Sequence, residues 1–411
     1  MEGRELPRPP RRIPAGAGSF TQLESTTPHG PQPPPRQPWL FGRILAGFIV
    51  LLIIVAGGVA TGWWIRSQSV DATTPKVIDA AGPEVTDTVG PEVMKAAGQA
   101  VVRVLATTCA GTGEATGVLL DEGVILTATS AIRQPLSIVI VTPDNKIRRA
   151  NLLGNSADGV AVMKLVGSLD TTPLPLADGD LDPKAGRVLI GYTASGKQTT
   201  QPIGTTDAPT PLSSVMNATK LGGPLVDSSG RVVGVVVGNT VPESAIVGAD
   251  KLRGYVAPGS TGITATLGTC ARSRGPQSAI VPELQVARTP LSLEVQRLLG
   301  RFLTLENRHD FETVQALYSK RLARSLTVTH DRQGHQTSYF FGAKVTEVNR
   351  SAKNGAFARV SLNVLFSPIA TGASGQTCNR LDYRYELVRQ GGKLVIDRAV
   401  AMSDSQACES E

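Results

Sequence analysis

The sequence predicts a membrane-anchored chain with two folded domains, an all-β domain followed by an α+β domain. An uncharged apolar run occupies residues 44–65. Short Val-, Ile- and Leu-rich runs separated by Gly, Asp, Asn and Ser turns fill residues 91–270, and such runs predict the strands of a barrel or sandwich. Residues 289–411 begin with apolar positions at helical spacing and continue with longer strand-like runs, which is typical of an α+β domain.

The N-terminal part of the chain is predicted to be a tail followed by a membrane span. Residues 1–43 are rich in Pro, Gly, Arg and Gln, and this composition predicts disorder. The tail is either a spacer or a docking site for a cytoplasmic partner that recognises proline. Residues 44–65 are long enough to cross the hydrocarbon layer as one helix and are too long for the apolar region of a cleaved signal peptide.

Basic residues give the orientation of this predicted span. Six arginines precede it, whereas residues 66–90, a polar stalk, carry only Arg66 and Lys76 beside several acidic residues. Since the more basic flank stays inside, the tail is predicted to be cytoplasmic and both folded domains to lie outside the plasma membrane.

Charge and composition exclude several classes of partner. The net charge is +7, but residues 67–270 carry more Asp and Glu than Lys and Arg, and the excess positive charge is divided between the two ends. No nucleic-acid-binding motif accompanies it, so we expect no nucleic-acid partner. No CxxC motif or Cys/His cluster occurs, so the sequence predicts no metal site and no cofactor.

The four cysteines predict two disulfide bridges. Cys109 and Cys270 bracket the β domain, and Cys378 and Cys408 both lie in the C-terminal domain. Of the three possible pairings, this placement favours Cys109–Cys270 and Cys378–Cys408. An even number of cysteines in domains outside the cytoplasm fits an oxidising compartment. Four free, buried thiols are the alternative.

Four stretches of the β domain occur in the order found in one enzyme family. They are VILTATSAI at residues 124–132, DGVAVMKL at 158–165, LGGPLVDSSGRVVGV at 221–235 and SAIV at 244–247. The third is similar to the motif GNSGGPLVD followed by GxVVGV, and the first two to VLTNAHVV and DLAVLKV. The domain thus resembles the trypsin-like, HtrA-type serine peptidases of bacteria, which implies a double β-barrel and a bacterial, actinobacterial-like cell-envelope protein.

The resemblance also implies where the catalytic groups of the family would fall. The general-base histidine falls on Ser130, the aspartate on Gly159, the nucleophilic serine on Leu221 and the oxyanion-loop glycine on Thr219. Leucine has no nucleophilic atom, and a serine cannot act as a base near neutral pH. Residues 30–308 contain no histidine that could replace it. The sequence therefore predicts no catalytic residues and a pseudopeptidase, which is not an enzyme.

What remains of the family's cleft predicts a binding function. An extended polypeptide or an envelope protein would pair with an open strand edge, and the binding residues would be Ser130, Leu221, Gly222 and Gly223. The alternatives are a divergent serine peptidase that uses Asp158 or a Ser–Lys pair, with Lys220 beside Ser213 or Ser214. A regulator of a partner enzyme and a ligand-binding C-terminal domain are further alternatives.

The C-terminal domain follows a linker, residues 271–288. Its order of helices and strands, with the stretch LTLENRHDFETVQALY, resembles the cystatin-like cone of nuclear transport factor two-like domains, some of which are enzymes with an Asp/His pair. His309 and Asp310 are adjacent, but Asp310 is predicted to cap the following helix. Residues 390–392 predict a hairpin turn. His330 and His335 flank a glycine and are predicted to be exposed.

Overall fold

The computed structural model describes residues 89–179, 185–203, 220–238, 246–275, 278–370, 373 and 375–409. The predicted tail at 1–43, the predicted span at 44–65 and the stalk up to residue 88 lie outside the described residues. Those three assignments therefore stay predictions. None of the helices in the described part of the chain is both long and apolar enough to cross a membrane.

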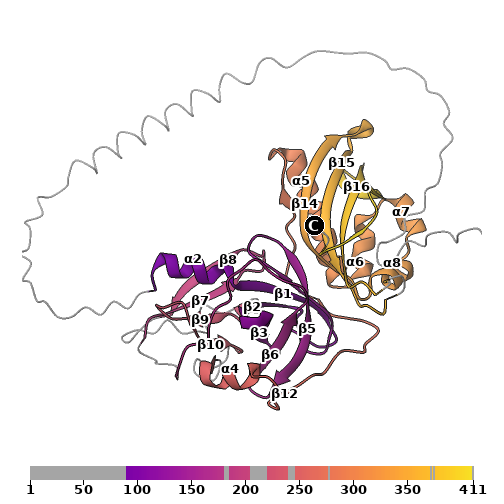
Figure 1. Ribbon diagram of the computed structural model, residues 1–411. Helices are drawn as coiled ribbons and strands as arrows, with labels where there is room; N and C mark the ends of the chain where they lie inside the picture. Colours follow the sequence, from indigo (N-terminus) through magenta and orange to yellow (C-terminus); the bar gives the residue numbers. More distant parts are fainter. Residues whose placement is uncertain are drawn as a thin grey trace, which may run out of the picture. The chain divides into compact units, whose positions relative to one another are not determined.

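The β domain contains a closed barrel of six antiparallel strands (Figure 1). A short helix, α2 (Pro91–Gln99), precedes it. Around the barrel the order is β1-β2-β3-β6-β5-β4, and β4 pairs with β1 again. The strands are β1 (Val101–Thr108), β2 (Glu114–Leu120), β3 (Val124–Ala128), β4 (Pro135–Val141), β5 (Ile147–Ser156) and β6 (Val160–Leu165). A 3₁₀ turn, η1 (Asp121–Gly123), joins β2 to β3, and β12 (Ile263–Thr264) pairs with β5.

A second, five-stranded sheet follows in the chain, with the order β11-β10-β9-β7-β8. Its strands are β7 (Arg187–Tyr192), β8 (Gln198–Ile203), β9 (Pro224–Val226), β10 (Val232–Val236) and β11 (Ile246–Gly248), and α4 (Ala249–Val256) comes next. The sequence patterns predicted β7 and β10 but not β8, because β8 is built from Gln and Thr and lies half exposed.

The core of the β domain is aliphatic, as its composition predicts. Its main cluster consists of Val, Leu, Ile, Ala and Met side chains, and Tyr192 is the one aromatic residue buried in it. Branched aliphatic side chains have few rotamers to lose and pack well on a pleated surface, so they can fill a barrel without Phe or Trp.

Both predicted disulfide bridges are confirmed. Cys109 is bonded to Cys270 and Cys378 to Cys408, with Cα–Cα distances of 5.8 Å and 5.5 Å. The first bridge joins the end of β1 to the segment that leaves the β domain, and it closes a loop of 161 residues. A bridge across so long a loop removes much of the conformational freedom of the unfolded chain.

The C-terminal domain is a mostly antiparallel sheet with helices packed against it (Figure 1). The helices are α5 (Pro290–Asn307), α6 (Phe311–Val314), η3 (Gln315–Leu317), α7 (Lys320–Ser325) and α8 (Val328–His335). The long strands β14 (Tyr339–Arg350), β15 (Ala356–Leu365), β16 (Cys378–Gln390) and β17 (Lys393–Ala401) are consecutive neighbours. The short elements are β13 (Glu283–Leu284), η4 (Ala352–Asn354) and β18 (Gln406–Ala407). Because β13 pairs with β14, the sheet begins inside the predicted linker, residues 271–288.

Local signals set the ends of these elements. Thr289 and Ser292 form a capping box at the start of α5. Asp310 accepts a hydrogen bond from the Thr313 amide at 3.2 Å, so its predicted role as an N-cap is confirmed. Gly391 and Gly392 have φ values of +58° and +80°, which a two-residue hairpin turn between β16 and β17 requires.

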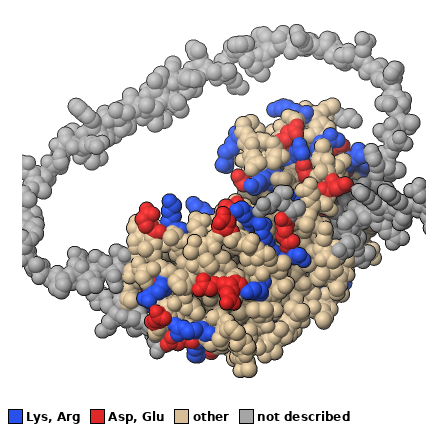
Figure 2. Space-filling view, in the orientation of Figure 1, with Lys and Arg blue, Asp and Glu red and all other residues tan. Residues whose placement is uncertain are grey.

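Several arginines of the C-terminal domain form ion pairs with acidic side chains. Arg389 contacts Glu294 at 2.6 Å, Arg321 contacts Asp397 at 2.9 Å, and Arg359 contacts Asp382. Figure 2 shows one face of the molecule, on which acidic and basic side chains lie next to one another rather than in a patch of one sign. On the face shown, this mixture leaves no continuous basic track of the kind that binds a phosphate backbone.

Candidate functional site

The three triad positions of the sequence analysis lie next to one another in the structure. Ser130 follows β3, and Gly159 immediately precedes β6, which pairs with β3. The amide of Thr129 donates to the Gly159 carbonyl at 2.8 Å. A Cβ at Gly222, the residue after Leu221, would lie 2.8 Å from the Ala128 amide nitrogen. Elements far apart in the sequence therefore bring these positions together at one end of the barrel.

A tight turn holds Leu221 in place. The Leu221 carbonyl accepts from the Thr116 amide at 2.9 Å, which fixes the turn to the barrel. The Gly222 amide donates to the Val236 carbonyl at 2.6 Å, and the Gly223 amide donates to the Lys220 carbonyl at 2.9 Å. Gly222 has φ +83°, and a Cβ there would lie 2.1 Å from the Thr116 carbonyl oxygen. Only glycine fits this position, because both its backbone angle and its surroundings exclude a side chain.

The groups at the triad positions are not those of an acyl-transfer site. Leu221 is half-buried and carries only carbon atoms in its side chain. The Ser130 hydroxyl oxygen is buried, and among the described residues it has no hydrogen-bond partner. Gly159 has φ +88° and supplies only backbone. Nucleophilic catalysis needs a nucleophile in hydrogen-bond contact with a base. Ser130 carries the one hydroxyl among these three residues, and within the described ranges that hydroxyl contacts no base.

Asp158, the acid group considered for a divergent peptidase, contacts helix α4. Its carboxylate accepts a hydrogen bond from the Tyr255 hydroxyl and lies 3.3 Å from the Lys251 ammonium, both on α4. These two contacts, with Tyr255 first, lower the pKa of Asp158. The side chain thus ties the turn before β6 to α4 as an ordinary surface ion pair.

The Ser–Lys alternative falls mostly outside the described residues and stays a prediction. A Cβ at Gly191 on β7 would lie 3.0 Å from the Lys220 Cγ, so the stem of Lys220 packs over that strand. Ser213, Ser214 and the oxyanion-loop position Thr219 lie outside the described residues. A cavity of about 590 Å³ occurs elsewhere, lined by Arg103, Tyr192 and Tyr339 among others, and none of the triad positions lines it.

Sequence reasoning missed one segment of the site, Val237 and Gly238. Val237 follows β10, and a Cβ at Gly159 would lie 3.6 Å from its side chain. Neither residue belongs to a strand, and neither makes a backbone hydrogen bond to another residue of the described ranges. The motif GxVVGVVVG predicted a strand here, but not that its end would lie beside the triad positions.

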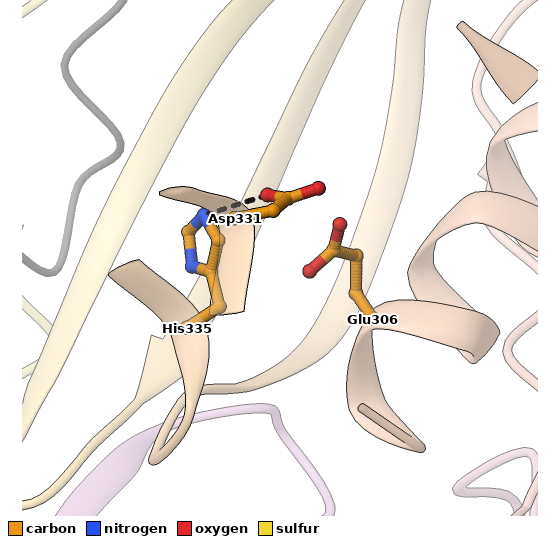
Figure 3. Close-up of side chains that lie close together, drawn as sticks. All are labelled: Glu306, Asp331 and His335. Carbon is orange, nitrogen blue, oxygen red and sulfur yellow. Dashed lines mark ion pairs between the residues drawn. The ribbon is translucent and has the colours of Figure 1, made fainter. Parts of the chain in front are cut away.

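A second group of polar side chains lies in the C-terminal domain. Glu306 comes from α5, and Asp331 and His335 come from α8 (Figure 3). The prediction that His335 is exposed was wrong: its side chain is 16% exposed, and its Nδ1 atom is buried. The glycine at 334 does not make a turn, because it lies within α8. His330, on the same helix, is exposed as predicted.

The comparisons with known proteins concern the β domain. Residues 115–235 match the family model of the trypsin-like peptidase domain. No curated protein sequence matches the chain. Among solved structures, the active form of the Rv3671c protease from M. tuberculosis is 22% identical, with 48% of this chain and 96% of that chain covered and a TM-score of 0.37.

Two further solved structures are similar at the same level. The inactive form of the Rv3671c protease gives 20% identity, coverage of 41% of this chain and 94% of that chain, and a TM-score of 0.33. The serine endoprotease from Yersinia pestis gives 22% identity, coverage of 40% of this chain and 64% of that chain, and a TM-score of 0.34. The match to the family model, on a closed six-stranded barrel, identifies residues 115–235 as a trypsin-like peptidase domain.

Proposed function

We propose that the β domain is a pseudopeptidase that binds an extended polypeptide in the bacterial cell envelope and does not cleave it. The observation that carries the proposal is the intact Gly222–Gly223 turn beside Ser130, Gly159 and Leu221. This support comes from a turn that is held against the barrel while Leu221 and Gly159 carry no nucleophilic or basic side-chain group. A site that retains shape without reactive groups can still exchange main-chain hydrogen bonds with a peptide.

The edge that such a peptide would use is the segment Val237–Gly238. This segment follows the end of β10, and the Val237 side chain lies beside Gly159. A peptide laid along it would form a short additional strand, and one of its side chains would reach the half-buried Leu221. Main-chain pairing provides affinity, and the apolar surface of Leu221 favours an apolar side chain.

The proposal is tested with fluorescein-labelled β-casein, an unstructured polypeptide, and the full-length protein. Val237→Pro removes the amide that would donate to the peptide, so we expect casein affinity measured by fluorescence anisotropy to fall at least tenfold. Val237→Ala is the matched control, because it keeps the amide and should change the affinity less than twofold. Equal affinities in the two variants, with unchanged melting temperatures, or fragments of casein on a gel, would contradict the proposal.

We also propose that both folded domains lie outside the plasma membrane. All four cysteines are in disulfide bridges, and such bridges persist in oxidising compartments. Proteinase K added to intact spheroplasts should therefore degrade the C-terminal domain and leave a small N-terminal fragment protected. A cytoplasmic protein in the same cells serves as the control for lysis. Full protection of the C-terminal domain would show that the orientation is the reverse.

A further inference from the structure

Glu306, Asp331 and His335 form a compact group inside the C-terminal domain. Asp331 and His335 are four residues apart on α8, so both project from the same face of that helix. Glu306 reaches them from α5, and Figure 3 shows its carboxylate turned toward the other two side chains. One nitrogen or oxygen atom from each residue lies within 4.8 Å of the others. The His335 Nε2 atom is 3.9 Å from an Asp331 carboxylate oxygen.

The group is deeply buried, and part of it lacks partners. Glu306 is 1% exposed and Asp331 is 2% exposed. The Tyr318 hydroxyl donates to Asp331 at 2.9 Å and is 3.5 Å from Glu306. In the described part of the chain, no partner is present for the Glu306 Oε2 atom or for the His335 Nδ1 atom. Buried polar atoms are rarely left in this state, because each one costs the free energy of its lost hydration.

The surroundings offer no cation from the protein itself. The group lines a cavity of about 40 Å³ whose other walls are apolar or aromatic, including Phe302, Phe340 and Tyr385. No Lys or Arg is among the residues that line it. Two carboxylates in such a place need either protons or a bound cation to offset their charge.

The composition of the group selects the kind of cation. Ca²⁺ takes six to eight oxygen ligands, and Mg²⁺ keeps an octahedral oxygen shell, neither of which fits two carboxylates and an imidazole in this volume. Zn²⁺ binds imidazole nitrogen and carboxylate oxygen, and three protein ligands with a fourth open position are common for it. Since its ligand atoms lie roughly 2.0–2.2 Å from the ion, the side chains need to approach one another by only about 1 Å.

We propose that Glu306, Asp331 and His335 bind one Zn²⁺ ion in the C-terminal domain. The fourth position faces the cavity, so a water molecule or the oxygen or nitrogen atom of a small ligand completes the coordination. Tyr318 holds Asp331 through its hydroxyl group and so orients one ligand, as outer hydrogen-bond partners commonly do at metal sites. This site departs from the sequence-based prediction of no metal, which considered only contiguous Cys and His motifs.

The proposal is tested on the full-length protein carrying no oligohistidine tag, because such a tag would itself bind zinc. After saturation with ZnCl₂ and dialysis, elemental analysis should give one Zn²⁺ per chain. Glu306→Gln, Asp331→Asn and His335→Gln should each weaken zinc binding at least tenfold in a competition titration with a chromogenic chelator. His330→Gln is the matched control, since His330 is exposed on the same helix, and it should bind as the unaltered protein does.

A second measurement keeps the test valid if one variant folds poorly. The unaltered protein loaded with Co²⁺ should show the visible absorption of four-coordinate cobalt without a thiolate band. In a separate measurement, zinc should raise the melting temperature of the metal-free protein. Less than 0.1 zinc per chain would overturn the proposal, as would equal losses in His330→Gln and His335→Gln. A rise in melting temperature for Glu306→Gln without any metal effect would also overturn it, because the group would then be a protonated carboxyl pair.

Discussion

The full-length protein treated with a fluorophosphonate probe is expected to remain unlabelled. Its rate of hydrolysis of a fluorogenic peptide should equal that of the Leu221→Ala variant. The reason is that Leu221 offers no atom for acylation, and the β domain itself supplies no imidazole, since residues 30–308 contain no histidine. Removal of a complete triad costs about 10⁶-fold in kcat in serine peptidases. The hydrolysis rate of the unaltered protein is thus expected to equal the background rate rather than that of an active peptidase.

Gel fluorescence and mass spectrometry of the labelled chain check this prediction. An active serine peptidase in the same tube is the positive control, and heat-denatured protein reports non-specific reaction. Specific labelling that persists in Leu221→Ala and disappears on substitution of another serine would show a divergent peptidase. The serines outside the described ranges, Ser213 and Ser214, would be substituted first because one of them could pair with Lys220.

Gly222→Ala is expected to destabilise the β domain by about 4 kcal/mol or more, which is the range of severe core and backbone strain. The new Cβ would lie 2.1 Å from the Thr116 carbonyl oxygen and 2.3 Å from the Thr127 Oγ1 atom. Neither can move freely, because Thr116 and Thr127 lie on paired strands of the closed barrel. Thermal unfolding followed by circular dichroism under non-reducing conditions measures the change.

Gly230→Ala separates the steric cost from the backbone cost. Gly230 has φ +82°, nearly the same as Gly222, but a Cβ there would meet only a Val93 carbon at 3.5 Å. Gly230→Ala should therefore lower the free energy of unfolding by only about 1–2 kcal/mol, which is the cost of placing an alanine in a left-handed backbone conformation. If both variants melted at the same temperature, the close packing of the Leu221–Gly223 turn against the barrel would be refuted. The glycine variants thus test whether the Leu221–Gly223 turn is closely packed, and the fluorophosphonate experiment tests whether the site is catalytically inactive.

Local features were the most predictable part of the protein. The strands β1–β7 and β10, the N-cap at Asp310 and the hairpin at Gly391–Gly392 follow from alternation, turn residues and capping, which act within a few residues. The placement of the cysteines in two domains was sufficient to predict both bridges. The strand β8 was missed because its polar side chains have no apolar alternation, and it is held by pairing with β7.

The sequence by itself determined the side chains at Ser130, Gly159 and Leu221, on which the prediction of an inactive β domain rests. Only the tertiary structure decided what surrounds them: that Asp158 is held by α4, and that Val237 ends beside Gly159. It also decided that Glu306, Asp331 and His335 share one cavity. Residue identity is local information, whereas burial and side-chain proximity depend on how distant elements pack. The position of His335 relative to its neighbours in the sequence therefore could not predict that its side chain lies in the interior rather than at the surface.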